Sequence, residues 1–406
     1  MTRRALILFD GGSNIQRYVE ASKVLDLHPI ILTADPDRYD YFAAEKVQAI
    51  QVDTGDLDAL IRVCCQLRAT YDIAGITAGL ESVYATVGKL CRYFDLPGPN
   101  PASIERCCDK FTQRQLLGEA SVPIPDYRLA ANAAEVERAA AEIGLPAVLK
   151  PAVGSGSIGV RLCRNADELA EHTTHLLGER QMWRSSPRIL VEEFAQGPLY
   201  SADIMGNELI GICAAEFGLP PHFVFRGYTH PAQLTYEEHE RIANVSLSCS
   251  QALGLGWGPW FVELRWTKRG PVVIEVNPRL AGVPDPRLVQ LAYGVDMVTE
   301  HIKIAIGEEW DLRKRYSHTA GVRFLIAERD GTLDWSGDTD AAAVPGVTEV
   351  ELYLEPKVPI VRKGDYRDII GHVIAASPSF AQTEEILERA VNLIRWSVSP
   401  FPRLCE

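Results

Sequence analysis

Three oxygen-bearing side chains stand on a predicted β-hairpin in the second half of the chain. The segment 259–283 contains two strand-like runs, FVELRW and VVIEVNP, with a glycine-containing turn between them. Because side chains alternate between the two faces of a strand, Glu263 on the first run can lie close to Glu275 and Asn277 on the second. Oxygen ligands that converge in this way suit Mg²⁺, especially where phosphate groups complete its coordination shell. An ion pair between one of the glutamates and a nearby arginine is the alternative interpretation.

A glycine-rich loop follows a lysine earlier in the chain. The run AVLKPAVGSGSIGV (147–160) predicts a strand that ends at Lys150, then a loop, then a second strand. The loop contains Gly154, Ser155, Gly156, Ser157 and Gly159. Glycines let backbone N–H groups approach an anion closely, and the lysine adds a point charge, so this loop is a candidate phosphate site. It is not a P-loop, because GxxxxGK[ST] is absent. A mobile loop between two strands is the alternative.

Further charged residues follow predicted strands. Glu192 and Glu193 end the apolar strand of RILVEEF. Taken alone, these two carboxylates are best explained as a solvated strand end. Glu81 comes just after the strand DIAGIT (72–77), a position where it can hold the amino group of a substrate or simply favour a helix N-terminus. His230 is a candidate general base because a neutral imidazole accepts a proton near pH 7; a substrate-binding or plain loop histidine is the alternative.

The elements that must position these residues fall into three parts. Strand and helix patterns alternate over the first hundred residues, which predicts a parallel sheet with crossover helices in an N-terminal α/β domain, 1–100. The turn cluster LPGPNP marks the domain edge, and the middle part, 101–310, carries most of the candidate site. From 311 to 406, three strand patterns and a closing helix predict a small α+β module. A chain of 406 residues is too long for one core, which agrees with this division.

Composition and charge narrow the class of protein. The net charge of −13 argues against a nucleic-acid partner, and the sequence contains no apolar run long enough to predict a membrane span. The opening MTRRALILFDGG has an apolar run of only five residues, so we expect a first strand and not a signal peptide. The nine cysteines include no CxxC pair, so we expect reduced thiols, a cytoplasmic location and no zinc site.

The turn DGGSN after the first strand raises the question of a dinucleotide site. It lacks the GxGxxG pattern, so the sequence gives little support to an NAD or FAD oxidoreductase. A tight strand–helix turn explains these glycines, and the following helix N-terminus can hold a substrate carboxylate.

These motifs, in this order, resemble the ATP-grasp superfamily. The resemblance covers nearly the whole chain, is strongest from Asp109 to Gly307, and rests most on IEVNPRLAG and on the segment from Lys150 through the glycine-rich loop. It implies an ATP-grasp fold of mixed α/β and α+β class, with a Rossmann-like N-terminal domain, a central domain with a lid subdomain at about 123–195, and the C-terminal α+β module.

The resemblance also implies roles for individual residues. Lys110 and Lys150 match the two nucleotide-phosphate lysines, and Arg279 matches the arginine that steadies the transferred phosphoryl group and touches the substrate. The flexible loop over the phosphates matches Gly154 to Gly159, and the adenine site matches Glu192, Glu193, Phe194 and Ala195. The Mg²⁺ ligands match Glu263, Glu275 and Asn277. Many members carry a ribose-binding glutamate where this chain has Leu199, so either Asp203 or another group takes over that contact, or ribose is held more loosely.

Within the superfamily, the chain is similar to the branch of L-amino acid ligases and related natural-product ligases. The segment 218–234, the NPRLAGV run and the C-terminal module carry this likeness, while Val283, Asp285 and Arg287 depart from the usual pattern beside Gly282, a candidate substrate contact. The implied activity is amide or peptide bond formation through an acyl phosphate, with ATP and Mg²⁺ (or Mn²⁺), on a small carboxylate and an amine in dipeptide, siderophore or other specialised-metabolite synthesis. A purine-pathway or carboxylase-like activity and a silent ATP-binding protein are the alternatives, and a homodimer is expected by resemblance.

Overall fold

The computed structural model describes residues 2–9, 14–38, 41–42, 45–178 and 187–401. The N-terminal domain holds a parallel four-stranded sheet in the order β3-β2-β1-β4. Its elements are β1 (Arg3–Phe9), α1 (Ile15–Val24), β2 (His28–Thr33), η1 (Pro36–Arg38), β3 (Gln48–Gln51), α3 (Leu57–Arg68), β4 (Tyr71–Ala78) and α4 (Glu81–Phe94). The strand–helix alternation therefore gives the Rossmann-like sheet that the sequence predicts. The turn at Gly11 and Gly12 lies outside the described residues.

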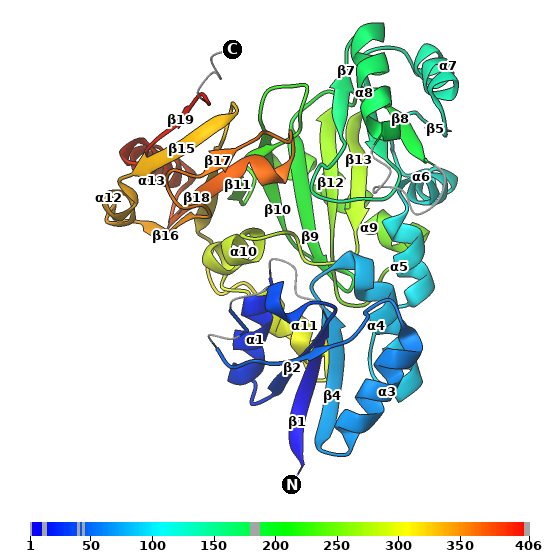
Figure 1. The fold of residues 1–406 in the computed structure, drawn as a ribbon, viewed down its shortest axis with the longest axis vertical. Coiled ribbons are helices and arrows are strands. Elements are labelled where there is room, and N and C mark those ends of the chain that lie inside the picture. The colour runs from blue at the N-terminus through cyan, green and yellow to red at the C-terminus, as the bar shows by residue number, and fades with distance from the viewer. Residues whose placement is uncertain (1, 10–13, 39–40, 43–44, 179–186, 402–406) are drawn as a thin grey trace.

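Two helices, α5 (Pro101–Cys108) and α6 (Lys110–Glu119), lead from this domain to a smaller antiparallel sheet in the order β5-β8-β6-β7. This subdomain, at the upper right of Figure 1, contains β5 (Tyr127–Ala130), α7 (Ala133–Ile143), β6 (Ala147–Pro151), β7 (Arg161–Cys163), α8 (Ala166–Gly178) and β8 (Ile189–Glu193). It brings together the strand that ends near Lys150, the glycine-rich loop and Glu192.

The largest sheet has eight strands in the order β13-β12-β9-β10-β11-β14-β18-β16. The first five of these are β9 (Leu199–Met205), β10 (Glu208–Phe217), β11 (Phe225–His230), β12 (Pro259–Thr267) and β13 (Gly270–Asn277). Helix α9 (Tyr236–Leu253) covers one face, where Ile242, Cys249 and Leu253 pack with Val262 and Leu264. The opposite face carries Glu263 and Glu275, and α10 (Asp285–Tyr293) and α11 (Met297–Ala305) follow the hairpin.

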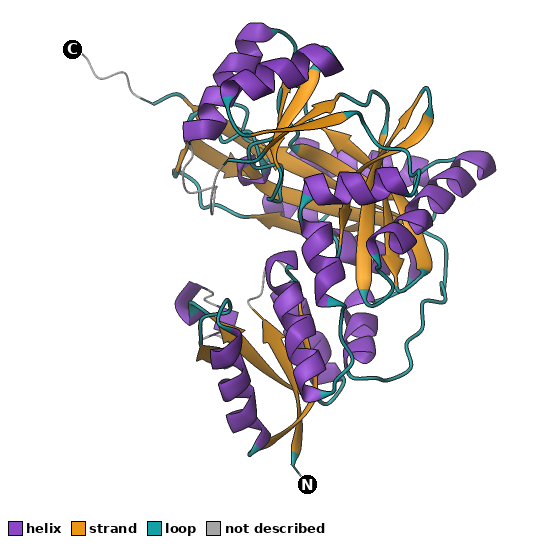
Figure 2. Cartoon of the chain, turned by 90° about the vertical axis from the view of Figure 1, so that its right-hand side faces the viewer, coloured by secondary structure: helices purple, strands orange, loops and turns teal. Residues whose placement is uncertain are grey.

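The C-terminal strands extend this sheet. Strands β14 (Thr319–Ile326), β16 (Val347–Leu352) and β18 (Ile369–Ser377) continue it beyond β11, through the pairing of Gly227 with Arg323. Without these strands β11 would be an edge strand with unpaired backbone groups, and pairing with β14 satisfies those groups. Three strands, β15 (Gly331–Ser336), β17 (Pro359–Ile360) and β19 (Arg395–Ser399), form a small separate sheet, accompanied by α12 (Asp338–Ala342), η3 (Tyr366–Asp368) and α13 (Phe380–Leu393). These elements lie beside the central sheet in Figure 1. Figure 2 shows the N-terminal sheet and its helices below the rest of the chain.

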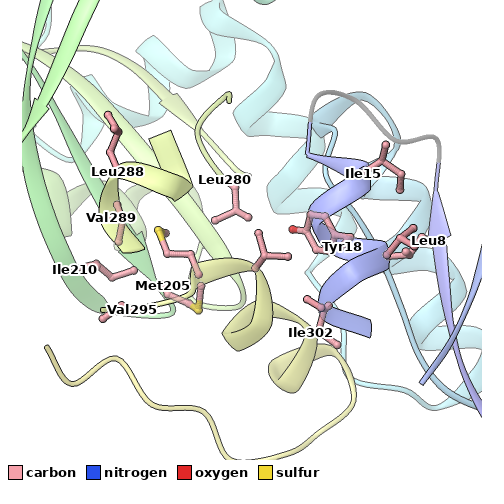
Figure 3. Close-up of a cluster of buried hydrophobic side chains, with 14 of the residues drawn as sticks. Leu8, Ile15, Tyr18, Met205, Ile210, Leu280, Leu288, Val289, Val295 and Ile302 are labelled. Carbon is pink, nitrogen blue, oxygen red and sulfur yellow. The ribbon is translucent and has the colours of Figure 1, made fainter. Parts of the chain in front are cut away.

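A continuous apolar cluster joins the N-terminal domain to the rest of the chain. Figure 3 shows Ile15 and Tyr18 of α1 on one side, Met205 and Leu288 on the other, and Leu280 between them. Burial of apolar side chains contributes about 25 cal/mol per Å², so a cluster of this extent holds the two parts together firmly. Loops at the boundary are thereby placed against each other, which matters for the site described below.

Helix lengths and cysteine pairing bear on the class of protein. No helix within the described residues is both long enough and apolar enough to span a bilayer. All eight cysteines in the described part of the chain are free thiols, as expected for a protein with reduced cysteines.

Candidate active site

A carboxylate pair and an amide lie where the hairpin predicts them. Strands β12 and β13 pair with Glu263 directly opposite Glu275, and with Phe261 opposite Asn277. Directly opposite residues point to the same face of an antiparallel pair, so the three side chains share one face of the sheet. Burial, and then the charge of Glu275, raises the pKa of Glu263 to about 7. Two partly buried carboxylates directly opposite each other concentrate negative charge that a cation can neutralise.

Lys110 connects this carboxylate pair to the glycine-rich loop. It is the first residue of α6, and Asp109 caps the helix by accepting from the backbone N–H of Thr112. The buried Lys110 Nζ lies 2.7 Å from Glu275 Oε1 and donates to the backbone oxygen of Gly154 over 2.6 Å. Burial disfavours both charges, yet the pairing keeps the pKa of Lys110 above its usual value and that of Glu275 below it. Helix α6 therefore sets the distance between loop and carboxylates.

Lys150, at the end of β6, belongs to a buried network of charges. Its Nζ lies 2.6 Å from Glu192 Oε2, and Arg114 Nε lies 2.7 Å from Glu192 Oε1. Burial lowers the pKa of Lys150, and the two cations hold the pKa of Glu192 below its usual value despite burial. Both oxygens of Glu192 are thus engaged by protein groups, which makes it the residue that positions Lys150. The contact between Glu192 and adenine stays a prediction.

The sequence reasoning missed Arg114. It lies one helical turn after Lys110 on α6, is fully buried, and also donates to the backbone oxygen of Ile274 on β13. An arginine at i+4 from a candidate phosphate lysine lies on the same face of the helix, and this spacing is the signal that could have identified it.

The glycine-rich loop needs its glycines. Gly156 and Gly159 have positive φ angles of 65° and 71°, and Ser157 between them has 61°. A Cβ at Gly156 would lie 2.5 Å from the ring of Tyr366, which comes from η3 in the C-terminal part. The loop, with Ser155 and Gly154, thus runs between the lid sheet and the C-terminal elements. Its exposed backbone is suited to close over phosphate groups.

The residues predicted to hold adenine follow β8. Phe194 packs near Val148 and Phe223, and the guanidinium of Arg265 lies 5.5 Å from the centre of its ring. Ala195 is buried. Glu193 points away from this apolar cluster into an exposed ion pair with Arg269, 2.7 Å long, so a direct role in nucleotide binding rests on resemblance alone.

Neither residue considered for ribose lies on an open surface. Leu199 is buried on β9, opposite Arg265 of β12. Asp203 faces the interior with 1% of its surface exposed, close to His230. We therefore withdraw Asp203 as a ribose ligand, because its carboxylate is enclosed by other side chains.

Arg279 and Glu81 meet across the domain boundary. Arg279 Nε lies 2.9 Å from Glu81 Oε2, and the guanidinium stacks 5.3 Å from the centre of the Phe261 ring. Glu81 is the first residue of α4, whose N-cap Leu80 offers no side-chain hydrogen bond. Gly282, just beyond, is exposed, and a Cβ there would meet no atom within 4 Å. Of the four residues predicted for substrate binding, Glu81 and Arg279 are thus in contact, Gly282 follows Arg279 along the chain, and His230 is buried in the central sheet.

His230 is enclosed. It has no exposed surface, and its Nε2 lies 2.8 Å from Asp285 Oδ1 and 3.5 Å from Asp203 Oδ2. In this conformation it reaches no substrate, so the interpretation as a general base needs correction: its position is that of a buried histidine held by two carboxylates.

Comparison with known proteins agrees with this arrangement. Residues 143–286 match the family model described as the ATP-grasp domain, and residues 323–399 match L-amino acid ligase C-terminal domain 2. The chain belongs to the ATP-grasp superfamily. The first match contains the glycine-rich loop, Glu263 and Glu275, and the second contains β16, β18 and the end of β14.

Three relatives show how far the likeness to this ATP-grasp chain extends. An uncharacterized protein of Sinorhizobium fredii is 61% identical over 404 residues, covering 99% of this chain and 84% of the relative. Human carnosine synthase 1 is 26% identical over 412 residues, covering 93% of this chain; the chain spans 49% of that relative's length. The crystal structure of L-amino acid ligase from Bacillus licheniformis superposes with a TM-score of 0.82 at 19% identity, covering 98% of this chain and all of that one. The last likeness establishes the shared fold.

Proposed function

We propose that the chain is an ATP-dependent carboxylate–amine ligase that forms an amide or peptide bond through an acyl phosphate and releases ADP and phosphate. One observation supports this proposal most strongly: Lys110 contacts both the Glu275 carboxylate and the backbone of the glycine-rich loop, as expected if a phosphate site lies beside a cation site. The two relatives with named activities, an L-amino acid ligase and a carnosine synthase, favour amide formation within the superfamily.

The residues fit a divalent cation. Glu263, Glu275 and Asn277 offer only oxygen donors, which suit Mg²⁺ and also Mn²⁺. Burial and the charge of Glu275 raise the pKa of Glu263 in spite of nearby cations, so a metal ion beside the two carboxylates would relieve their remaining repulsion. When bound, the cation would neutralise charge on the ATP phosphates.

The chain's own residues supply the remaining chemistry. A carboxylate is a poor electrophile, and attack of its oxygen on the γ-phosphorus of ATP converts it into an acyl phosphate with a good leaving group. Phosphoryl transfer depends mainly on positioning and charge neutralisation. Lys110 and Lys150 are placed to neutralise the nucleotide phosphates, and Arg279 the transferred group. Because acyl phosphates hydrolyse readily, closure of the glycine-rich loop would exclude water until the amine attacks.

The substrate pocket is assigned to the region around Glu81, Arg279 and Gly282. A guanidinium beside a small residue can hold a carboxylate by paired hydrogen bonds. The Glu81 carboxylate, freed from Arg279, is able to accept from a substrate amine. We propose a small carboxylic acid or amino acid as donor and an amine as acceptor, in dipeptide, siderophore or other specialised-metabolite synthesis.

The test is phosphate release from Mg²⁺-ATP in the presence of single amino acids, hydroxy acids and polycarboxylic acids, with and without an amine. We expect ADP and phosphate to appear only with the correct carboxylate, and hydroxylamine to trap the acyl phosphate as a hydroxamate. Release of AMP and pyrophosphate would exclude the acyl-phosphate route. Phosphate release that depends on bicarbonate alone would favour a carboxylase-like activity, and ATP binding without turnover on any substrate would favour a silent nucleotide-binding protein.

A further inference from the structure

Four potential metal ligands come together close to the segment 278–284 between β13 and α10, which we call the NPR loop. None of the four belongs to the residues assigned to Mg²⁺. They are Asp203 of β9, Cys213 of β10, His230 of β11 and Asp285 at the start of α10, and all are buried. Ligand atoms of Cys213, His230 and Asp285 lie within 4.8 Å of one another, and Asp203 Oδ2 lies 3.5 Å from His230 Nε2.

The sheet places these side chains on one face. In the pairing of β9 with β10, Ser201 lies opposite Cys213 and Asp203 lies opposite Gly211. In the antiparallel pairing of β10 with β11, Ala214 lies opposite Thr229, so Cys213, the residue before Ala214, is level with His230, the residue after Thr229.

An aromatic ring closes the cluster beside Asp203. A Cβ at Gly211 would lie 2.7 Å from the ring of Tyr293, so this ring fills the space that the glycine leaves. The rings of Tyr293 and His230 meet edge to face, with centres 6.1 Å apart. Tyr293 is itself buried, so the four ligand side chains lie in a closed compartment.

The charges of this cluster are not balanced by protein groups. Among the described residues, the recorded ion-pair contacts of Asp203 and Asp285 are both with His230. Both oxygens of Asp203, Oδ2 of Asp285 and Nδ1 of His230 are buried without a hydrogen-bond partner in the described part of the chain. Burying an unpaired charge is costly, so two carboxylates and at most one imidazolium leave an excess of negative charge. Burial and the nearby Asp285 accordingly raise the pKa of Asp203.

We propose that Cys213, His230, Asp203 and Asp285 bind a Zn²⁺ ion that fastens the NPR loop to the central sheet. One thiolate, one imidazole and two carboxylates form a mixed set of the kind that binds zinc, and four buried protein ligands leave no position for substrate. Zinc binding would release the thiol proton and any proton shared by the carboxylates. The donor atoms need only small side-chain rotations, because ligands around a tetrahedral zinc lie about 3 to 4 Å apart.

This site is distinct from the Mg²⁺ site. The residues assigned to Mg²⁺ offer only oxygen, whereas this cluster includes sulfur and nitrogen. Its role is structural: Asp285 follows Gly282 and Arg279 along the chain, so fixing Asp285 fixes the loop that carries them. The proposal depends on the fold and not on the ligase activity, so the two can fail independently.

The experiment measures metal directly. Protein from zinc-supplemented cultures, purified without chelators, is analysed by plasma mass spectrometry, and we expect about one zinc per chain after desalting. Metal-stripped protein given Co²⁺ alone should show a thiolate-to-cobalt charge-transfer band. Cys213→Ser and His230→Gln should each lose the metal and the band. Cys249→Ser, which changes a buried cysteine on the opposite face of the sheet, and Glu275→Gln, which changes the Mg²⁺ site, should keep both.

Two results would overturn the proposal. One is wild-type protein with less than about a tenth of a zinc per chain and no cobalt band, which would mean that protons alone balance the cluster. The other is metal retained by both Cys213→Ser and His230→Gln. If either variant fails to fold, Asp203→Asn and the protection of Cys213 from thiol reagents by added Zn²⁺ in the wild type give the same decision.

Discussion

Arg279 Nε and Glu81 Oε2 lie 2.9 Å apart although 198 residues separate them in the sequence. Arg279 follows β13 of the central sheet, and Glu81 is the first residue of α4 in the N-terminal domain. The apolar cluster of Figure 3 holds these two parts together, so the contact depends on how the domains pack against each other. Under the proposed function, a substrate carboxylate would compete with Glu81 for this guanidinium.

Glu81→Gln should weaken the hold on Arg279 while preserving shape, and we expect kcat/KM for the carboxylate substrate to fall about 10-fold. Arg279→Lys removes the planar fork and should cost more. A double-mutant cycle read from kcat/KM should show a coupling of about 1–3 kcal/mol, because the two side chains are in contact. Additive losses would show that Glu81 acts on substrate without Arg279.

Glu275→Gln should lower kcat about 100-fold or more, because it removes a metal ligand and the partner of Lys110. The fold should persist, as judged by circular dichroism and thermal unfolding. The matched control is Glu208→Gln, an exposed residue at the β10 turn, which should leave turnover unchanged. Unchanged turnover in Glu275→Gln would refute the assignment of this residue to the cation.

Arg114→Met should destabilise the chain by about 3–5 kcal/mol, since it leaves the buried Glu192 with only one cation. The control Arg128→Met breaks a pair with Glu142 in which both side chains are about half exposed, and should cost no more than about 1 kcal/mol. Urea unfolding of both variants measures the difference. Equal losses would mean that Arg114 does not balance a buried charge.

Gly156→Ala should impair loop closure. Its φ of 65° costs a side-chain-bearing residue about 1–2 kcal/mol, and the added Cβ would press on Tyr366. We expect the KM for ATP to rise about 5-fold, measured by phosphate release at saturating carboxylate. Gly118→Ala, within α6 and in ordinary contact with Ile124, should leave the KM unchanged. A rise in both variants would point to a general effect on the fold.

His301 predicts a pH dependence of stability. Burial lowers its pKa to about 3, and its ring nitrogens contact Tyr18, Thr77 and Tyr84 at 2.5 to 3.0 Å. The unfolded chain takes up the proton near pH 6.5, before the folded chain does. The neutral His301 therefore contributes its full stabilisation of the folded state above about pH 6.5. This stabilisation is lost as the pH falls toward 3, by about 1.4 kcal/mol per pH unit.

Urea unfolding between pH 7 and pH 4.5 tests this dependence, with His301→Gln as the non-titrating control. The difference in stability between the two proteins should shrink as the pH falls. A constant difference across this range would show that His301 does not titrate on unfolding.

Local patterns along the chain predict those parts of the fold that depend on neighbouring residues. Alternation of strands and helices predicts the N-terminal sheet, and the period of two along FVELRW and VVIEVNP puts Glu263 near Glu275, because the side chains of a hairpin meet over short distances in the sequence. The glycine-rich loop was visible because positive φ angles at Gly156 and Gly159 demand glycine.

Contacts between segments that lie far apart in the sequence could be seen only in the folded structure. Arg114 meets Glu192 across 78 residues, and the helix pattern of α6 does not say which carboxylate it will face. The C-terminal strands extend the central sheet because β11 offers an edge, which no local pattern encodes. The cluster of Asp203, Cys213, His230 and Asp285 is the clearest case: no spacing along the chain suggested it, because its side chains come from three strands and a helix that pairing and packing bring together.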